Sequence, residues 1–351
     1  NDDLCSPASG KVTDGGIFMR MGKRTLAGLL AAAMLAAAAP VTAFAAGADT
    51  GKAIQLVDES NPTGGISGWD SATGYDFIYF GDYSPGAFVD PIKWRVLDTK
   101  TNMENAKEGD GLFLLSDVLL GAGSTGNVYF DHSGNQSNAW QGSTAQEGCV
   151  AHYNVDFSEG EKDAVLATTK SDGAFTSSTH EVTFAASENI LNEDRVFFLS
   201  AEEAENSAYG FTDDDARKAL FGDNTGTWWL RSPVAGSTSD VGVVFMFGAV
   251  EDRNVDSELA ERPAFNLDLN SVLFTSAAEG GKAGDAIFEI DDYDGNEWKL
   301  TLLDRSREFA VTEETASGKP GGTITLNYTG ATTGTNEYIS VIIADVALQK
   351  K

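Results

Sequence analysis

Short apolar runs separated by glycine-rich polar segments recur along the chain after residue 75. Residues 92–97 alternate apolar and polar side chains, and residues 111–116 form a continuous apolar run. Alternation with a period of two is typical of a half-buried strand, whereas a short continuous run is typical of a strand buried on both faces. The 38 glycines and 8 prolines indicate many tight turns. The same patterns predict further strands at 77–80, 227–231, 241–247, 262–269, 286–290, 298–303, 323–328 and 337–343.

Signals for helices are fewer and short. Capping boxes begin at Ser158 and at Ser200, each followed three residues later by a glutamate. A third helix is expected over 212–221, where Gly222 would end it. A few short helices among many strands predict an α+β fold.

The charge balance excludes one class of partner. The chain has 24 Lys and Arg against 53 Asp and Glu, a formal net charge of −29. Such an excess repels phosphate backbones and anionic membrane surfaces, so we expect no nucleic-acid partner. Two cysteines provide neither a disulfide scaffold nor a Cys-rich metal site.

The N-terminal segment has the pattern of an export signal. Residues 1–20 are expected to be an upstream or non-native extension, and residues 21–45 a signal peptide. Lys23 and Arg24 precede an uncharged apolar run, and Ala-Phe-Ala at 43–45 is a small-x-small cleavage site. The apolar run is shorter than a membrane span. We therefore expect a protein exported to the extracellular space or cell surface of a bacterium, with no integral membrane span after cleavage.

The exported chain is expected to contain two units. Residues 46–74 are predicted to be an extended lead-in, and residues 75–307 a domain that ends in a hairpin. Residues 308–351 are rich in Thr, Gly, Val and Ile, and are expected to be a truncated all-β module. Cys149 would be alone after cleavage, so stability must come from burial of a core.

Motifs that usually carry catalysis or cofactor binding are absent or lack their context. Residues 121–126 match G-x-G-x-x-G but no helical pattern follows them, and the acidic stretch 291–297 lacks the first Asp of an EF-hand. His132, His152 and His180 have no metal-ligand spacing, and there is no G-x-S-x-G or H-E-x-x-H string. We therefore predict no catalytic residue, no cofactor and no metal site. A catalytic triad scattered along the chain and calcium in another acidic loop stay open.

The string Trp228-Trp229-Leu230-Arg231-Ser232-Pro233 is the most unusual in the chain. Adjacent Trp residues on a strand point to opposite faces, so one should enter the core while the other faces a second layer or a ligand. Six residues are assigned to the scaffold: Trp94, Trp228, Trp229, Arg231, Arg262 and Pro263.

The segment 234–261 combines a small skeleton with large and charged side chains. The skeleton is Val241, Gly242, Val244, Gly248, Val250 and Val255. Since Phe245, Met246 and Phe247 are consecutive, a strand cannot bury all three on one face. The alternative is a strand buried on both sides. The candidate ligand-binding residues are Val243, Phe245, Met246, Phe247, Glu251, Asp252, Arg253, Asn254, Asp256, Ser257 and Glu258.

Five strings occur in an order that resembles an uncharacterised domain of exported bacterial proteins. They are Ile78-Tyr79-Phe80-Gly81, Pro91-Ile92-Lys93-Trp94-Arg95-Val96-Leu97, Phe113-Leu114-Leu115-Ser116, Trp228-Trp229-Leu230-Arg231-Ser232-Pro233 and Arg262-Pro263-Ala264-Phe265-Asn266-Leu267. The resemblance covers about residues 75–275 and implies a C-type-lectin-like fold, shared with formylglycine-generating enzymes. Some members resemble variable proteins of diversity-generating retroelements, in which the segment corresponding to 234–261 is diversified and binds the ligand.

The chain also departs from these relatives. Ala260-Glu261 stands where Gly-Val usually precedes Arg-Pro, and the copper-binding Cys pair of formylglycine-generating enzymes is missing. The Glu-Pro-Asn and Trp-Asn-Asp strings of animal lectins are absent as well, so calcium-dependent sugar binding has no direct support. Residues 308–351 resemble the start of an immunoglobulin-like module.

These observations favour a non-enzymatic, exported recognition protein of the adhesin or receptor type. Loops at 234–261 would contact a macromolecular ligand, either protein or glycan, on a C-type-lectin-like scaffold followed by a partial immunoglobulin-like β-sandwich. The alternatives are a cell-wall or glycan-directed hydrolase that uses acidic residues, and a purely structural surface module.

Overall fold

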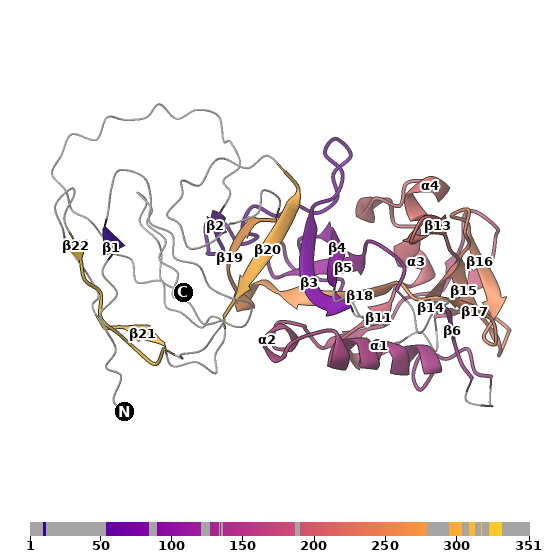
Figure 1. Ribbon diagram of the computed structural model, residues 1–351. Helices are drawn as coiled ribbons and strands as arrows, with labels where there is room; N and C mark the ends of the chain where they lie inside the picture. Colours follow the sequence, from indigo (N-terminus) through magenta and orange to yellow (C-terminus); the bar gives the residue numbers. More distant parts are fainter. Residues whose placement is uncertain are drawn as a thin grey trace.

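The computed structural model describes residues 10–11, 54–83, 90–120, 127–132, 134, 136–186, 190–278, 295–303, 309–312, 317 and 323–331 (Figure 1). The predicted signal peptide, the glycine-rich 121–126 segment, the acidic turn up to residue 294 and the predicted strands 286–290 and 337–343 lie outside this set. The described part is mostly β-sheet with few helices, which fits the α+β class as well as a mainly-β class. None of its helices has the length and apolar character needed to span a membrane.

The largest sheet has eight strands in the order β11-β18-β5-β4-β3-β20-β19-β2. Their bounds are Phe197–Phe198, Pro263–Asp268, Gly111–Ser116, Asp90–Asp98, Phe77–Tyr83, Glu297–Leu302, Val272–Ala277 and Ile54–Leu56. All neighbours pair antiparallel except β20 and β3, which are parallel. β2 lies in the predicted lead-in, so residues from 54 onward contribute to this sheet.

A second sheet has five strands in the order β16-β15-β14-β17-β6. Their bounds are Val250–Asn254, Asp240–Val244, Trp228–Pro233, Glu258–Ala260 and Asn127–Tyr129. β14 pairs antiparallel with β15 and parallel with β17. This sheet therefore contains the three strands of the 234–261 segment (β15, β16 and β17) and the Trp-Trp string that precedes it.

The other strands form two-stranded pairs. These are β7 (Thr168–Lys170) with β10 (Leu191–Asp194), β8 (Phe175–Thr176) with β9 (Thr183–Phe184), β12 (Leu220–Phe221) with β13 (Asn224–Thr225), β21 (Ala310–Val311) with β23 (Tyr328–Thr329), and β1 (Gly10–Lys11) with β22 (Thr323–Ile324).

The helices are α1 (Thr144–Val155), α2 (Glu159–Lys162), α3 (Ala201–Ala204) and α4 (Asp214–Arg217), with 3₁₀ turns η2 (Ser207–Tyr209) and η3 (Leu269–Ser271). Both predicted capping boxes are present, at the starts of α2 and α3. The third helix is shorter than predicted, because Lys218 leaves the helical region and 220–221 pair as β12. The longest helix, α1, was not predicted from the sequence; it lies along the lower side of the described body in Figure 1.

Two predicted strand boundaries also differ. The turn expected after residue 80 is a bulge within β3, where Gly81 has φ +72 and lies too close to Phe157 for a side chain of its own. The strand expected over 241–247 ends at Val244, as described below.

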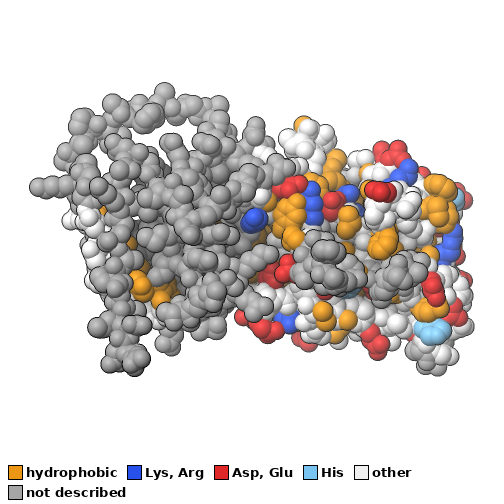
Figure 2. Space-filling view, viewed as in Figure 1, with side chains coloured by type: hydrophobic (Ala, Val, Ile, Leu, Met, Phe, Trp, Pro, Cys, Tyr) orange, Lys and Arg blue, Asp and Glu red, His pale blue; other side chains and the backbone are white. Residues whose placement is uncertain are grey.

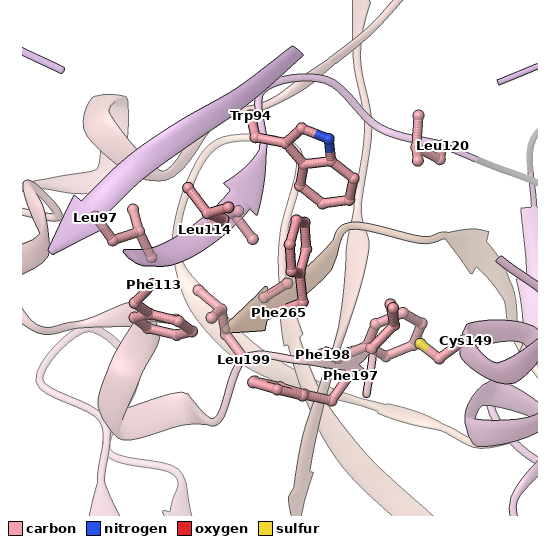
Figure 3. Packing of buried hydrophobic residues seen from close by; sticks show 14 of the residues in the cluster. Trp94, Leu97, Phe113, Leu114, Leu120, Cys149, Phe197, Phe198, Leu199 and Phe265 are labelled. Carbon is pink, nitrogen blue, oxygen red and sulfur yellow. The ribbon is translucent and has the colours of Figure 1, made fainter. Parts of the chain in front are cut away.

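The core lies against the eight-stranded sheet (Figure 3). Phe265 of β18 packs edge-on against Trp94 of β4, with ring centroids 4.7 Å apart, and also contacts Phe157. The Trp94 indole donates to the carbonyl of Phe80 at 2.7 Å, so its polar end is satisfied inside the core. Cys149 of α1 is buried beside Phe198, which joins the helix to this core.

Candidate recognition surface

A tight turn joins β15 to β16 and presents the three consecutive large apolar residues. Val244 pairs with Val250, and the amide of Gly248 donates to the carbonyl of Phe245 at 2.7 Å. Residues 245–247 therefore leave the strand, which corrects the prediction that they alternate between the two faces of a sheet. They are carried instead on a β-turn at its end.

Helix α4 packs against the turn at Gly248. Gly248 has φ +98, and a Cβ atom there would lie 1.7 Å from the carbonyl oxygen of Asp214. Arg217 Nε donates to the Gly248 carbonyl at 2.6 Å. Glycine at 248 thus permits both the backbone conformation and the close approach of α4.

We define the hairpin tip as Phe245, Met246, Phe247, Glu251 and Arg253. Phe247 is 66% exposed and Met246 37%, whereas Phe245 is half-buried. The Phe245 ring meets Phe247 edge-on at 5.5 Å and lies under the guanidinium of Arg253 at 4.7 Å. Glu251 pairs with Arg253 at 3.1 Å. The exposed Phe247 ring therefore packs against the Phe245 ring, which in turn lies under the Arg253 cation.

The other candidate residues are not all brought to this tip. Asn254 is the last residue of β16, and Asp256, Ser257 and Glu258 follow it, at the end opposite the turn. There Glu258 accepts from the Tyr129 hydroxyl at 2.5 Å, and Asp256 lies 3.7 Å from His132. Asp252 is half-exposed on β16. Val243 is fully buried in β15, so its assignment as a ligand contact is corrected: the side chain faces the core and not solvent.

A hollow of about 580 Å³ adjoins the hairpin tip. Its lining includes Thr179, Glu205, Asp214 and Arg217. The Thr179 hydroxyl bonds both the amide and the carbonyl of Val250, and Arg217 bonds Gly248, so the hollow shares its wall with the turn. Residues 178, 179, 205 and 212–217 were not singled out from the sequence, because they join the turn only through tertiary contacts.

The carboxylates of this hollow are committed to structural partners. Glu205 accepts from Ser178, Asp213 caps α4, Asp214 pairs with Arg217, and Asp215 pairs with Lys218. The hydrogen bond and the charge of Lys218 lower the pKa of Asp215. The acidic side chains of 213–215 form an exposed rim of this hollow.

Exposed apolar side chains concentrate near the tip. Of the eight large apolar residues with the greatest exposure in the described chain, Leu220, Phe221, Met246 and Phe247 belong to the β12–β13 and β15–β16 hairpins. The Met246 amide donates to the Thr227 hydroxyl at 3.1 Å, which connects the turn to the segment that follows β13. Figure 2 shows hydrophobic side chains among charged ones at this end of the molecule.

All six residues assigned to the scaffold are buried. Trp228 and Trp229 are both fully covered, since β14 lies inside its sheet with packing on both faces. Trp229 donates to the Val128 carbonyl at 2.9 Å, and Trp228 lies under the guanidinium of Arg262 at 4.9 Å.

Arg231 is the centre of a buried ion network that the sequence did not reveal. It pairs with Asp172 and, at 2.6 Å, with Glu203, and Lys170 bridges the same two carboxylates at 2.7 and 2.5 Å. Burial opposes ionisation of Glu203, but Arg231 and Lys170 outweigh it and hold the pKa of that carboxyl far below its usual range. Glu203 also closes the capping box of α3, so one residue joins the helix to the Trp-Trp strand.

His152 forms a second buried cluster. Its Nδ1 lies 2.6 Å from Asp156 and its Nε2 3.1 Å from Glu261. Burial opposes protonation of the imidazole, but the two carboxylates outweigh it and raise the pKa of His152 to about 9. The cluster links α1 to the segment between β17 and β18, which carries Glu261 and Arg262. No group of three or more residues suited to hold a metal ion occurs within the ranges that the structure describes.

Comparison with known proteins gives one family match. Residues 109–269 match a family model described as a domain of unknown function (DUF6273). No curated protein and no solved structure matches the chain. The matched segment contains β14 to β18 and the hairpin tip, whereas β2, β3, β4, β19 and β20 of the large sheet lie outside it.

Proposed function

We propose that the chain is an exported, non-enzymatic recognition protein that binds a protein partner through the hairpin tip. The observation that carries this proposal is the exposed Phe247 ring on a turn held by Gly248, Arg217 and α4. A large apolar side chain that is solvated in the free protein gains free energy when a partner covers it. Because the turn is already ordered, binding loses little conformational entropy.

The chemistry of the surrounding residues favours a protein partner with a basic rim. Aromatic residues, Met and Arg are enriched at protein interfaces, and the tip combines Phe245, Met246, Phe247 and Arg253. The adjoining hollow exposes the acidic side chains of 213–215. Lys or Arg side chains of a partner would complement this rim, while an apolar side chain would cover the Phe247 ring.

The proposal also includes a specific fold for each of the two units. We infer a C-type-lectin-like scaffold for the first unit from the five strings and their order, and an immunoglobulin-like start for 308–351 from its Thr-, Gly-, Val- and Ile-rich sequence. The similarity to variable proteins of diversity-generating retroelements supports the assignment of the 234–261 segment as a changeable surface. Phe245, Met246 and Phe247 of the tip lie on a turn between two strands, where substitutions leave the ladder of β15 and β16 intact.

The proposal is tested with peptides selected from a phage-displayed random library on the purified protein. Phe247→Ala should weaken their binding by about tenfold or more, as truncation of an interface anchor does. The free energy of unfolding should change by no more than about 0.5 kcal/mol, because the ring is mostly exposed. Selected peptides should be enriched in Lys or Arg.

Val155→Ala is the matched control, since Val155 is 78% exposed on α1 and lies outside the tip. Peptide binding should be the same for this variant and the unaltered protein. Peptides that bind Phe247→Ala as tightly as the unaltered protein would place the binding site elsewhere. Unfolding of Phe247→Ala would show that the ring belongs to the core.

A further inference from the structure

A second hollow lies away from the hairpin tip and has a different chemistry. It has a volume of about 470 Å³, within the usual range of small-ligand sites. Segments distant in sequence form it: 63–73, 97–99, Glu108 and Ala208. No residue of 234–261 lines it. We call this hollow the Trp69 cleft.

Trp69 is held in place at the wall of this cleft. Its amide bonds the Leu97 carbonyl at 3.4 Å, and its ring packs against Tyr75 at 6.5 Å. Gly210, with φ +86, lies so close behind that an added Cβ would fall 2.5 Å from the indole. The Tyr75 hydroxyl donates to the Tyr209 carbonyl at 2.8 Å, which fixes the ring that supports Trp69. The indole is therefore a half-exposed, rigidly supported apolar surface.

The remaining lining is rich in hydrogen-bonding oxygen atoms. Hydroxyl groups come from Thr63, Ser67, Thr73 and Thr99, and carboxylates from Asp70, Asp98 and Glu108. Ionised carboxylates only accept hydrogen bonds, so they suit a ligand that offers hydroxyl or amide donors. No Lys or Arg is among the described residues that line the cleft, which disfavours an anionic ligand.

We propose that the Trp69 cleft binds a pyranose oligosaccharide that carries no carboxylate or sulfate group. A sugar ring has an apolar face of C–H groups, which can stack on the indole, and a rim of hydroxyls, which can donate to Asp98 and Glu108. An aromatic cage for a quaternary ammonium would need further aromatic walls, and Trp69 is the aromatic residue among the described lining. No residue of the hairpin tip is part of this site.

The three carboxylates of the cleft differ in the hydrogen bonds that they already accept and in their burial. Glu108 already accepts from the Thr99 hydroxyl, and Asp70 accepts from the amides of Ala72 and Thr73. Asp98 accepts from the amides of Thr99 and Lys100 and has the Lys100 ammonium at 3.8 Å, but it is the half-buried one of the three carboxylates, and this desolvation raises its pKa. Asp98 is therefore the carboxylate that gains most from a ligand hydroxyl.

Calorimetric titration of the full chain with cellopentaose, N-acetylchitopentaose and pentagalacturonic acid tests the proposal. At least one neutral pentasaccharide should bind, and pentagalacturonic acid should bind about tenfold more weakly or not at all. Trp69→Ala should weaken the neutral ligand about tenfold, while Trp69→Phe, which keeps an aromatic face, should weaken it only about threefold. Asp98→Asn should weaken it by a smaller factor than Trp69→Ala.

Two further variants keep the result interpretable. Phe247→Ala should bind the pentasaccharide like the unaltered protein, which separates this site from the proposed protein-binding tip. Glu108→Gln retains an acceptor for Thr99 and should reduce the discrimination against pentagalacturonic acid. The proposal is overturned if neither neutral pentasaccharide binds at millimolar concentration, if folded Trp69→Phe and Asp98→Asn both bind like the unaltered protein, or if pentagalacturonic acid binds equally well.

Discussion

At the scale of single residues, the described core contains ionisable groups that are stabilised in contrasting ways. Arg231 is surrounded by the carboxylates of Asp172 and Glu203. Arg262 instead donates to the carbonyls of Ser116 and Arg217 and lies over Trp228. Burial, with Arg95 nearby, lowers the pKa of Arg262 well below its usual range. Removal of one partner from the Arg231 network would leave a buried charge uncompensated. The assignment of Arg231 to the scaffold therefore agrees with its buried ion pairs.

His152 makes stability depend on pH. Its pKa is raised from 6.5 to about 9 in the folded protein, so the protonated form is favoured by folding. The contribution of His152 to the free energy of unfolding is complete below pH 6.5 and is lost as pH rises through about 9. A shift of this size corresponds to at most about 3 kcal/mol. Urea unfolding should show that the unaltered protein loses free energy of unfolding between pH 6 and pH 10. In His152→Gln this loss should be much smaller. An equal loss in both proteins would contradict the role of His152.

At the scale of elements, the β15–β16 hairpin gains its rigidity from its neighbours. The ladder pairs five residues of each strand, and the turn is then closed against α4 through Gly248. The β8–β9 pair lies on the other side, where Thr179 bonds Val250 and His180 lies 3.3 Å from Glu251. The tip is therefore a fixed element at the edge of its sheet, which suits a binding surface that loses little entropy.

Gly248→Ala tests this contact. A methyl group would collide with Asp214 and would also occupy a positive-φ backbone, so we expect a loss of about 2–4 kcal/mol of unfolding free energy. Gly236→Ala is the matched control, because Gly236 has φ +81 but open space around its Cβ position. It should cost only about 1 kcal/mol. Chemical denaturation of both variants measures the difference, and equal losses would mean that α4 does not hold the turn.

At the scale of the whole molecule, the two proposed surfaces flank one short element. Ser207 of η2 lines the hollow beside the hairpin tip, and Ala208 of the same turn lines the Trp69 cleft. Both hollows are lined mainly by acidic and hydroxyl side chains, in keeping with the chain's net charge of −29. This charge disfavours anionic partners at either surface.

Export is the prediction that concerns the chain as a whole. The order of Lys23 and Arg24, the apolar run and the Ala-Phe-Ala site at 43–45 leads us to expect cleavage after Ala45. N-terminal sequencing of secreted material from a bacterial host should begin at Ala46 or Gly47. Recovery of the protein in the cytoplasm with residues 21–45 intact would contradict export.

The sequence by itself determined five strands of the large sheet (β3, β4, β5, β18 and β20), β14 and β15 of the second sheet, two capped helices and the buried framework, because these depend on local period and on short-range hydrogen bonds. It did not indicate α1, whose buried residues are mainly Ala145 and Cys149, too few for a recognisable apolar stripe. Tertiary structure decided that 245–247 form a turn, since the contact of Gly248 with Asp214 joins residues 34 positions apart. It also assembled the Arg231 network, the His152 cluster and the Trp69 cleft. Each depends on packing between distant segments, which a local pattern of side chains does not encode.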